Sequence, residues 1–323
     1  MRIKWIFFLL IALTAGISKA QEAEDFDALE RELILYAYEM HNDTSAQNRL
    51  SAAKEAARLL AEILIKKGSY KHLFTELKGI SILEPADKKF KIFSWEVFEN
   101  KDTYRQFGII QTANEKVFVL EDKSESIKMA EQARLKNDNW YGALYYHIQP
   151  FTTGINNETQ YLLLGRDSYS FFERRKVIDI LYFDFSGKPK FGNNILQVKD
   201  VNGQMRNVCR YFLQYSAAVS VILRYDQNMD MIVFDHLILG SPIGKDAPPS
   251  NVPDGSFNGL KLLKGKWGFV NMVFEYDPNN VLENAQNPEM IMSQGNKKRD
   301  GNKDIFGKDK NASKNKQIKV NQP

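Results

Sequence analysis

The sequence is poor in the residues that most often mark an active site, since its 323 residues include one cysteine and four histidines. The single cysteine, Cys209, cannot form a disulfide within the chain, so a chain of this length must be held together by its hydrophobic core. Cys209 lies in an apolar, strand-like run. A free cysteine in such a run is most often a buried structural thiol, and we predict that role rather than a nucleophilic one.

Recognisable catalytic motifs are also missing. The chain contains no Gly-x-Ser-x-Gly, no His-Glu-x-x-His, no P-loop and no dinucleotide fingerprint. His41, His72 and His147 are widely separated, and each is interpreted as a structural or surface residue. A glycosidase-type pair of carboxylates is compatible with the many acidic residues, but no pair stands out. The catalytic residues are therefore unknown at this stage, and no cofactor is predicted.

Long apolar runs are absent after residue 20. Residues 5–17 form an uncharged apolar run, which follows Arg2 and Lys4 and precedes Ser18-Lys-Ala20. This pattern is typical of a secretory signal peptide, 1–20, cleaved before Gln21. An uncleaved anchor helix is the alternative, but the run is shorter than the roughly 20 residues that span a bilayer. We expect a soluble exported protein, periplasmic or at the cell surface, with no transmembrane segment after cleavage.

The net charge of +4 is concentrated at the two ends of the chain. Residues 296–323 are rich in Lys and Asn and nearly lack large apolar side chains, so the tail, 286–323, is predicted to be disordered. Contact of this tail with an anionic surface is the alternative. The residues between the ends carry a net negative charge, which argues against nucleic acid as a partner.

Two helices are predicted near the N-terminus, because apolar residues recur there every three to four positions. One helix starts near Phe26, and the second follows Thr44-Ser-Ala-Gln47, whose spacing fits a capping box. A third short helix is predicted over 70–77, between Gly68 and Gly79. Residues 21–80 are therefore predicted to form a helical segment packed on the rest of the protein.

Residues 81–285 are predicted to form one domain rich in antiparallel strands. Short reversals such as Ser186-Gly-Lys-Pro189 and Asn202-Gly203 join neighbouring antiparallel strands. One helix, 124–135, is predicted to interrupt the series. The strands are predicted at 90–98, 103–112, 115–120, 141–151, 160–164, 176–185, 195–201, 207–215, 219–225, 229–236, 260–263 and 267–276. The expected fold class is α+β, with a helical hairpin and a β body that is a sandwich, barrel-like or a strongly bent sheet.

Polar residues gather in one stretch, Tyr225-Asp-Gln-Asn-Met-Asp-Met-Ile-Val-Phe-Asp-His-Leu237. Asp226, Asn228 and Asp230 match the first three ligand positions of a calcium loop. Met231 then stands where the loop needs Gly, and Leu237 stands where it needs a bidentate Glu. These three residues are therefore incomplete metal candidates, and no metal is predicted. The stretch is interpreted as a hairpin turn whose side chains mostly face water.

The second arm of this hairpin gives three further expectations. Phe234 is predicted to be buried, and His236 is predicted to have a hydrogen-bond partner or to reach the sheet edge. Asp235 and His236 are adjacent on a strand, so they face opposite sides and cannot pair with each other. Downstream, Asp254-Gly-Ser-Phe-Asn-Gly259 is interpreted as a turn rather than a phosphate-binding loop, because no helix follows it.

Several blocks resemble a family of exported bacterial proteins of the Bacteroidota type. They are Phe90-Lys-Ile-Phe-Ser-Trp95, Gln106-Phe-Gly-Ile-Ile-Gln111, Tyr161-Leu-Leu-Leu-Gly165, Val233-Phe-Asp-His-Leu237 and Pro253-Asp-Gly-Ser-Phe-Asn-Gly259. The resemblance covers residues 70–276, although the segment after Trp95 is poorer in Gly than is common there. It implies export and a β-rich body. The family carries no established activity to transfer.

Two functional hypotheses follow from the sequence. The first is a non-enzymatic periplasmic or cell-surface binding protein, whose partner is a protein or a glycan. The alternative is a carboxylate-dependent hydrolase that acts on envelope or extracellular polymers. The absence of a specific catalytic motif favours binding, whereas two carboxyl groups facing each other across a cleft would favour the enzyme.

Overall fold

The computed structural model describes residues 25–274, except 101, 155–157 and 201. One compact unit ends at Asn271, and the elements below belong to it. The predicted signal peptide, the predicted tail and the predicted domain boundary at residue 285 lie outside the described residues. Within the described part, two helices precede three open, mainly antiparallel sheets, so the predicted α+β class is confirmed. No helix in that part is both long and apolar enough to cross a membrane.

The two predicted helices are α2 (Phe26–Asn42) and α3 (Ala46–Leu64). Asp25 caps α2 by accepting a hydrogen bond from the Ala28 amide at 3.0 Å. The cap of α3 is Ser45, one residue after the Thr44 that the capping-box pattern indicated. Buried residues recur every three to four positions along each helix, so each helix has one apolar face.

The third helix predicted over 70–77 is wrong. A single 3₁₀ turn, η1 (Ser69–Lys71), follows Gly68, and the chain then continues as a loop. Phe74 adopts a left-handed φ of 51°, which a continuous helix does not tolerate. The amides of Glu76 and Leu77 donate instead to the Glu30 carboxylate on α2, so tertiary contacts replace helical hydrogen bonds.

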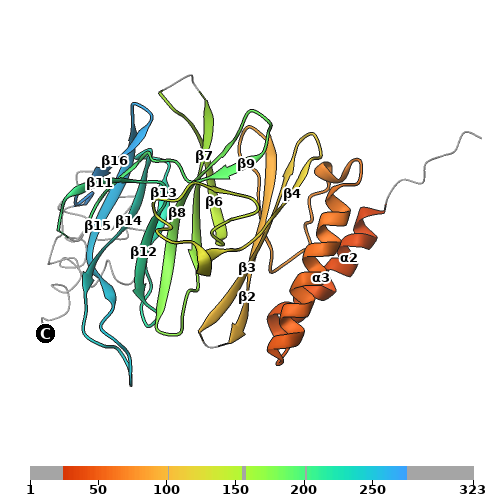
Figure 1. Ribbon diagram of the computed structural model, residues 1–323, viewed down its shortest axis with the longest axis horizontal. Helices are drawn as coiled ribbons and strands as arrows, with labels where there is room; N and C mark the ends of the chain where they lie inside the picture. The colour runs from red at the N-terminus through yellow and green to blue at the C-terminus, as the bar shows by residue number, and fades with distance from the viewer. Residues whose placement is uncertain (1–24, 101, 155–157, 201, 275–323) are drawn as a thin grey trace, which may run out of the picture. The chain divides into compact units, whose positions relative to one another are not determined.

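The strands form three sheets (Figure 1). The first sheet has the order β1 (Ser81–Leu83), β2 (Phe90–Asn100), β3 (Thr103–Thr112), β4 (Val117–Leu120). The central sheet has the order β5 (Leu135–Lys136), β9 (Pro189–Phe191), β8 (Glu173–Phe183), β7 (Thr159–Asp167), β6 (Leu144–Thr152), and β12 (Tyr211–Ser216) also pairs with β8. The third sheet has the order β11 (Met205–Val208), β10 (Leu196–Lys199), β16 (Lys266–Val270), β15 (Asn251–Leu263), β14 (Met231–Leu239), β13 (Leu223–Asp226).

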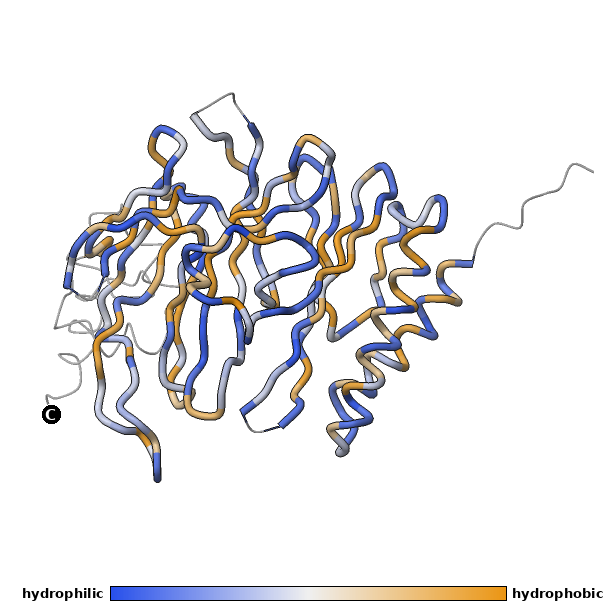
Figure 2. The backbone as a smooth tube through the Cα atoms, viewed as in Figure 1, coloured by the Kyte–Doolittle hydropathy of each residue, from blue (hydrophilic) through white to orange (hydrophobic). Residues whose placement is uncertain are grey.

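Three apolar cores join these elements into layers. On β2, Phe93 faces the helices, whereas Ile92 faces the central sheet. On β7, Leu163 faces the first sheet and Leu162 faces the third. The order of the layers is therefore helices, first sheet, central sheet, third sheet (Figure 1). Figure 2 shows the hydrophobic stretches that follow the strands and the helix faces in these layers.

The helix predicted over 124–135 is also wrong. Only a 3₁₀ turn, η2 (Ser124–Ser126), forms there, followed by irregular turns. Asp122 accepts hydrogen bonds from the amide and the hydroxyl of Ser124, and Met129 has a φ of 52°. These local bonds favour a turn over a helix, since short polar side chains compete for the backbone groups.

Candidate functional site: a cleft beside strand β12

A cleft of about 720 Å³ lies between β12 of the central sheet and strands β14 to β16 of the third sheet. We call it the β12 cleft. Its size is within the range of pockets that hold small ligands, roughly 300 to 1,000 Å³. Aromatic, amide and charged side chains all line it. The lining includes Tyr211, Phe212, Phe269, Gln214, Asn251, Asn258, Glu131, Lys199, Arg206 and His236.

The cleft forms where the inner face of the third sheet changes from apolar to polar. Ile232 and Leu260 are register partners, and both belong to the core between the sheets. The next pair along the same face is Phe234 and Asn258. Phe234 is 1% exposed, as predicted, whereas Asn258 brings a polar amide to the cleft. The apolar core therefore ends at this row, and polar groups begin.

Beyond that row, a β-bulge brings His236 and Asp254 together. The register shifts between Asp235 and Leu237, and Gly255 adopts a φ of 88° that few other residues tolerate. The segment that we interpreted as a turn is therefore a bulge inside β15. His236 Nδ1 lies 2.8 Å from Asp254 Oδ2, which confirms that His236 has a hydrogen-bond partner.

The Asp254 carboxylate orients the imidazole of His236. Partial burial raises the pKa of Asp254, but hydrogen bonds from Ser256 and His236 outweigh burial and leave that pKa below its usual range. An ionised Asp254 makes Nδ1 of His236 the donor, so Nε2 is the acceptor in the neutral ring. The His236 side chain is 41% exposed, so this nitrogen is accessible to a ligand.

Ser256 completes a Ser, Asp and His group, but the order of contacts is not that of a catalytic triad. The Ser256 hydroxyl donates to Asp254 Oδ1 at 2.7 Å, whereas a triad nucleophile donates to the histidine. The His236 ring therefore has no serine to activate among these three residues. The arrangement supplies an oriented hydrogen-bonding group instead.

Charged side chains form another wall of the cleft. Arg206 NH1 lies 2.7 Å from Glu131 Oε2, and this hydrogen bond raises the pKa of Arg206. The neighbouring Tyr211 is mostly buried, and burial together with Glu131 raises its pKa to about 12. Lys199 Nζ lies 5.1 Å from the centroid of the Phe269 ring. The wall therefore offers donors, acceptors and ring faces side by side.

Asp235 and His236 bond different partners. Asp235 is 5% exposed, and its Oδ2 accepts a hydrogen bond from the Ile222 amide at 2.6 Å. Burial, with a smaller contribution from the nearby Asp254, raises the pKa of Asp235 to about 6. The pKa values of Asp235 and Asp254 are thus shifted in opposite directions.

The three metal candidates, Asp226, Asn228 and Asp230, lie at the turn between β13 and β14, as the hairpin interpretation predicted. The turn itself uses their polar groups. Asp226 Oδ1 accepts from the Asn228 amide, Asp226 Oδ2 lies 2.7 Å from Arg224 NH2, and Asp230 accepts from the Tyr225 hydroxyl. Asp226 is 2% exposed, so the expectation that these side chains mostly face water is wrong for this residue.

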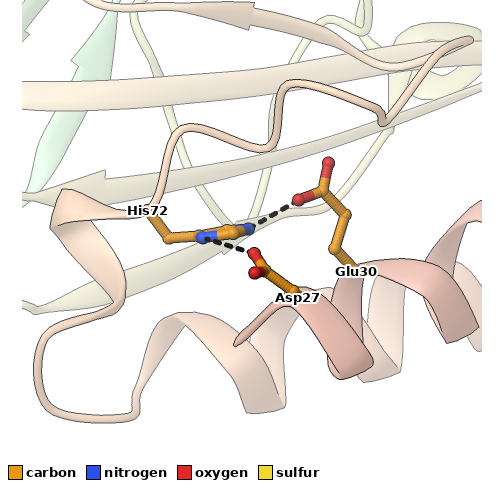
Figure 3. A group of neighbouring side chains, drawn as sticks. All are labelled: Asp27, Glu30 and His72. Atoms are coloured by element: carbon orange, nitrogen blue, oxygen red, sulfur yellow. Dashed lines mark hydrogen bonds and ion pairs between the residues drawn. The ribbon is translucent and has the colours of Figure 1, made fainter. Parts of the chain in front are cut away.

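Among the described residues, one group of side chains lies close enough to be considered for a metal ion, namely Asp27, Glu30 and His72 (Figure 3). His72 Nε2 lies 2.6 Å from Glu30 Oε2, and His72 Nδ1 lies 3.9 Å from Asp27 Oδ1. Two ligands of a tetrahedral zinc ion would be about 3.3 Å apart. The shorter contact is a direct hydrogen bond, and the two carboxylates face different ring nitrogens. The group is therefore interpreted as a bridge that fixes the loop after η1 to α2.

Cys209 is 3% exposed, and burial raises the pKa of its thiol. The predicted burial of this residue is confirmed. The β12 cleft, in contrast, was not predicted, because its residues come from segments that are distant in sequence. The one available signal was Pro253-Asp-Gly-Ser256, which interrupts the alternation of a strand in the manner of a bulge.

Comparison of the chain with protein-family models, with curated proteins and with solved structures gave no match. The geometry and chemistry of the cleft are therefore the grounds for a functional proposal.

Proposed function

We propose that this is an exported binding protein that holds a glycan in the β12 cleft. The observation that carries the proposal is the mixed lining of the cleft, in which aromatic rings stand beside amides and an oriented histidine. Sugar rings present C–H faces that pack on aromatic rings, and their hydroxyls need donors and acceptors in the same site. Polar side chains line the cleft beside the rings, and His236 Nε2 supplies an acceptor.

Charge supports a glycan over the other ligand classes. The cleft contains the Arg206–Glu131 pair and both Lys199 and Asp200, so it has no strong excess of either sign. Nucleic acid would require an extended basic surface.

Export is part of the proposal and rests on the N-terminal sequence. Arg2 and Lys4, the apolar run and Ser18-Lys-Ala20 together follow the pattern of a cleaved signal peptide. The native protein should therefore begin at Gln21 and be recovered from the periplasm or the cell surface. Mass spectrometry of the native N-terminus tests this, and an intact Met1 in the membrane fraction would contradict it.

The hydrolase hypothesis has one observation in its favour, which is the opposite pKa shifts of Asp235 and Asp254. The two residues lie on adjacent strands of the third sheet, Asp254 does not line the cleft, and Asp235 is bonded to the Ile222 amide. A pair of carboxyl groups that flank a glycosidic bond needs to reach it from both sides. We therefore favour binding without hydrolysis.

The test is calorimetric titration of the protein with a panel of neutral and acidic oligosaccharides. The variant His236→Ala removes the oriented acceptor at an exposed position and should weaken the preferred oligosaccharide about tenfold. Tyr38→Ala is the matched control, because Tyr38 is 70% exposed on α2 and does not line the cleft. Equal affinity of both variants, or no binding by the unmodified protein, would reject the proposal. Chromatography of the same mixtures detects cleavage products, whose appearance would favour the hydrolase.

A further inference from the structure

A second group of side chains, outside the β12 cleft, concentrates positive charge at one end of β7 and β8. Arg166 on β7 and Lys176 on β8 are direct register partners, so their side chains leave the same face of the central sheet. Arg174 lies two residues before Lys176 and therefore shares that face. None of these three residues lines the β12 cleft. We call them, with Tyr215, the β7–β8 basic cluster.

Like charges directly opposite each other in a sheet are destabilising, so this arrangement needs a compensating partner. Within the described residues, no carboxylate lies within ion-pair distance of Lys176, whose Nζ stands 5.0 Å from the centroid of the Tyr146 ring. Burial lowers the pKa of Lys176, and the charge of Arg166 lowers it further. The lysine is thus a half-buried cation without an anion.

The other two cations are only partly neutralised. Arg166 NH2 lies 3.0 Å from Glu96 Oε1, and the Arg166 side chain is still 52% exposed. Arg174 NH1 donates to the carbonyl oxygens of Ser168 and Glu173, each at 3.0 Å, rather than to a carboxylate. Among the described residues, the three cations therefore have one carboxylate partner, Glu96, which pairs with Arg166 alone.

Tyr215 adds an independent observation. It is the register partner of Arg174 on β12, and it is 8% exposed. Its side chain packs beside Arg174, and a phenolic hydroxyl can rotate to donate a hydrogen bond to a ligand. Burial raises the pKa of Tyr215, Arg174 and Arg166 oppose that rise, and Glu96 adds to it, so both guanidinium groups and this carboxylate lie near the phenol. The tyrosine therefore places a hydroxyl donor next to the cations.

We propose that the β7–β8 basic cluster binds an oxyanion, a phosphate or sulfate group, between Lys176, Arg166, Arg174 and Tyr215. An oxyanion would separate the two like charges of the Arg166 and Lys176 pair and accept a hydrogen bond from the Tyr215 hydroxyl. Charge-assisted hydrogen bonds of this kind are the strong ones, and a half-buried position strengthens them further. The group arrives either as the free ion or as a substituent of an acidic glycan.

The probe is inorganic phosphate, titrated into the full chain at constant ionic strength with chloride as the replaced ion. Phosphate should raise the melting temperature of the unmodified protein and of the control Lys190→Met, whose ammonium pairs with Asp184 at 3.0 Å elsewhere on the central sheet. Lys176→Met should raise the dissociation constant for phosphate about tenfold or more, and Tyr215→Phe by about fivefold.

The same variants distinguish an anion site from a merely structural lysine. Without phosphate, Lys176→Met should melt at a higher temperature than the unmodified protein, because the like-charge pair is gone; a structural lysine would give the opposite sign. Absence of phosphate binding to the unmodified protein, or equal binding by Lys176→Met, Tyr215→Phe and the control, overturns the proposal. Titration with a sulfated disaccharide beside inorganic sulfate then identifies the source, since a glycan-borne group should bind more tightly than the free ion.

Discussion

At the residue scale, Phe234 is the side chain that closes the core below the β12 cleft. It is 1% exposed, and its ring centroid lies 5.9 Å from that of Tyr211. We predict that Phe234→Ala costs about 3 to 5 kcal/mol of unfolding free energy, the range for deleting a buried aromatic ring. Phe185→Ala is the control, because Phe185 is fully exposed and should change stability by less than about 0.5 kcal/mol. Urea denaturation measures both, and similar losses would contradict the assignment.

Asp226 shows how a correct turn prediction can miss a buried residue. The hairpin was readable because turn residues separate two strand-like runs, but the ion pair with Arg224 depends on side-chain directions that the pattern does not specify. Asp226→Ser should cost about 1 to 3 kcal/mol, since it removes a buried acceptor of two amides. Asn228→Ser, at an exposed position, should cost less than about 0.5 kcal/mol.

Calcium provides the second measurement on this turn. Because the Asp226 oxygens are occupied by protein donors, melting curves with calcium and with a chelator should coincide. A shift of several degrees that disappears in Asp226→Ser would show that the turn binds the ion.

His147 is expected to make stability depend on pH. Its ring stacks on Tyr225 with centroids 5.5 Å apart, its Nε2 is buried without a partner among the described residues, and burial lowers its pKa from 6.5. The folded protein favours the neutral ring, so this contribution to stability is complete at pH values above the pKa of His147 in the unfolded chain. As the pH falls through that value, the unfolded chain takes up the proton first, and stability is lost by up to about 1.4 kcal/mol per pH unit.

The variant His147→Phe keeps a ring against Tyr225 and removes the titration. Urea denaturation at about pH 7.5 and about pH 5 should show a smaller loss for His147→Phe than for the unmodified protein. If His147→Phe and the unmodified protein lost the same stability between the two pH values, other groups would be the cause of the pH dependence.

At the scale of elements, local patterns predicted what local interactions determine. The two helices and the β13–β14 hairpin follow from apolar spacing and turn residues, and they form where expected. The helices predicted over 70–77 and 124–135 do not form, because Glu30 and Asp122 capture backbone amides there. The first of these bonds joins residues 46 positions apart, which no local pattern contains.

A buried ion pair connects β8 to the segment that precedes β12. Asp179 and Arg210 are both 0% exposed, with Arg210 Nε 2.8 Å from Asp179 Oδ2. Neither residue was singled out from the sequence, because burial of a charge depends on which partner the fold supplies. We predict that Asp179→Asn costs about 3 to 5 kcal/mol, because it leaves the guanidinium buried and unpaired.

The double variant Asp179→Leu, Arg210→Met supplies the control for this pair. It removes both charges, so it should be more stable than Asp179→Asn, which a comparison of urea denaturation midpoints would show. If the double variant were the less stable of the two, the ion pair itself rather than the avoidance of an unpaired charge would hold these elements together.

At the scale of the whole described unit, the stacking of three sheets was not predicted, but one sequence feature corresponds to it. Tyr161-Leu-Leu-Leu164 on β7 is apolar without alternation, and the structure buries β7 on both faces. A strand covered on both sides has no polar face, so its pattern loses the period of two. The sequence alone could not separate this case from a buried helix segment, because a short apolar run is compatible with both.

The β12 cleft shares this limitation, since it exists only once the central and third sheets have stacked. Glu131, Arg206 and His236 come from a loop, β11 and β14, and no spacing in the sequence relates them. Part of the β7–β8 basic cluster could have been predicted from the sequence, because Arg166 and Lys176 lie on the two strands of one hairpin. Its Tyr215 comes from β12, so recognition of the whole cluster also needed the sheet.

The layer order makes a last prediction about the helices, which cover one face of the first sheet. Phe93, Trp95 and Ile109 on that face share a core with α2 and α3 and are 0% exposed. Removal of residues 25–80 would expose this apolar face to water, and contiguous apolar patches of that kind cause association. The shortened chain should therefore aggregate or bind a hydrophobic dye, measured by light scattering and dye fluorescence. Because the other two cores do not include the helices, a monomeric product with a cooperative melting transition would instead show that the β sheets are stable alone.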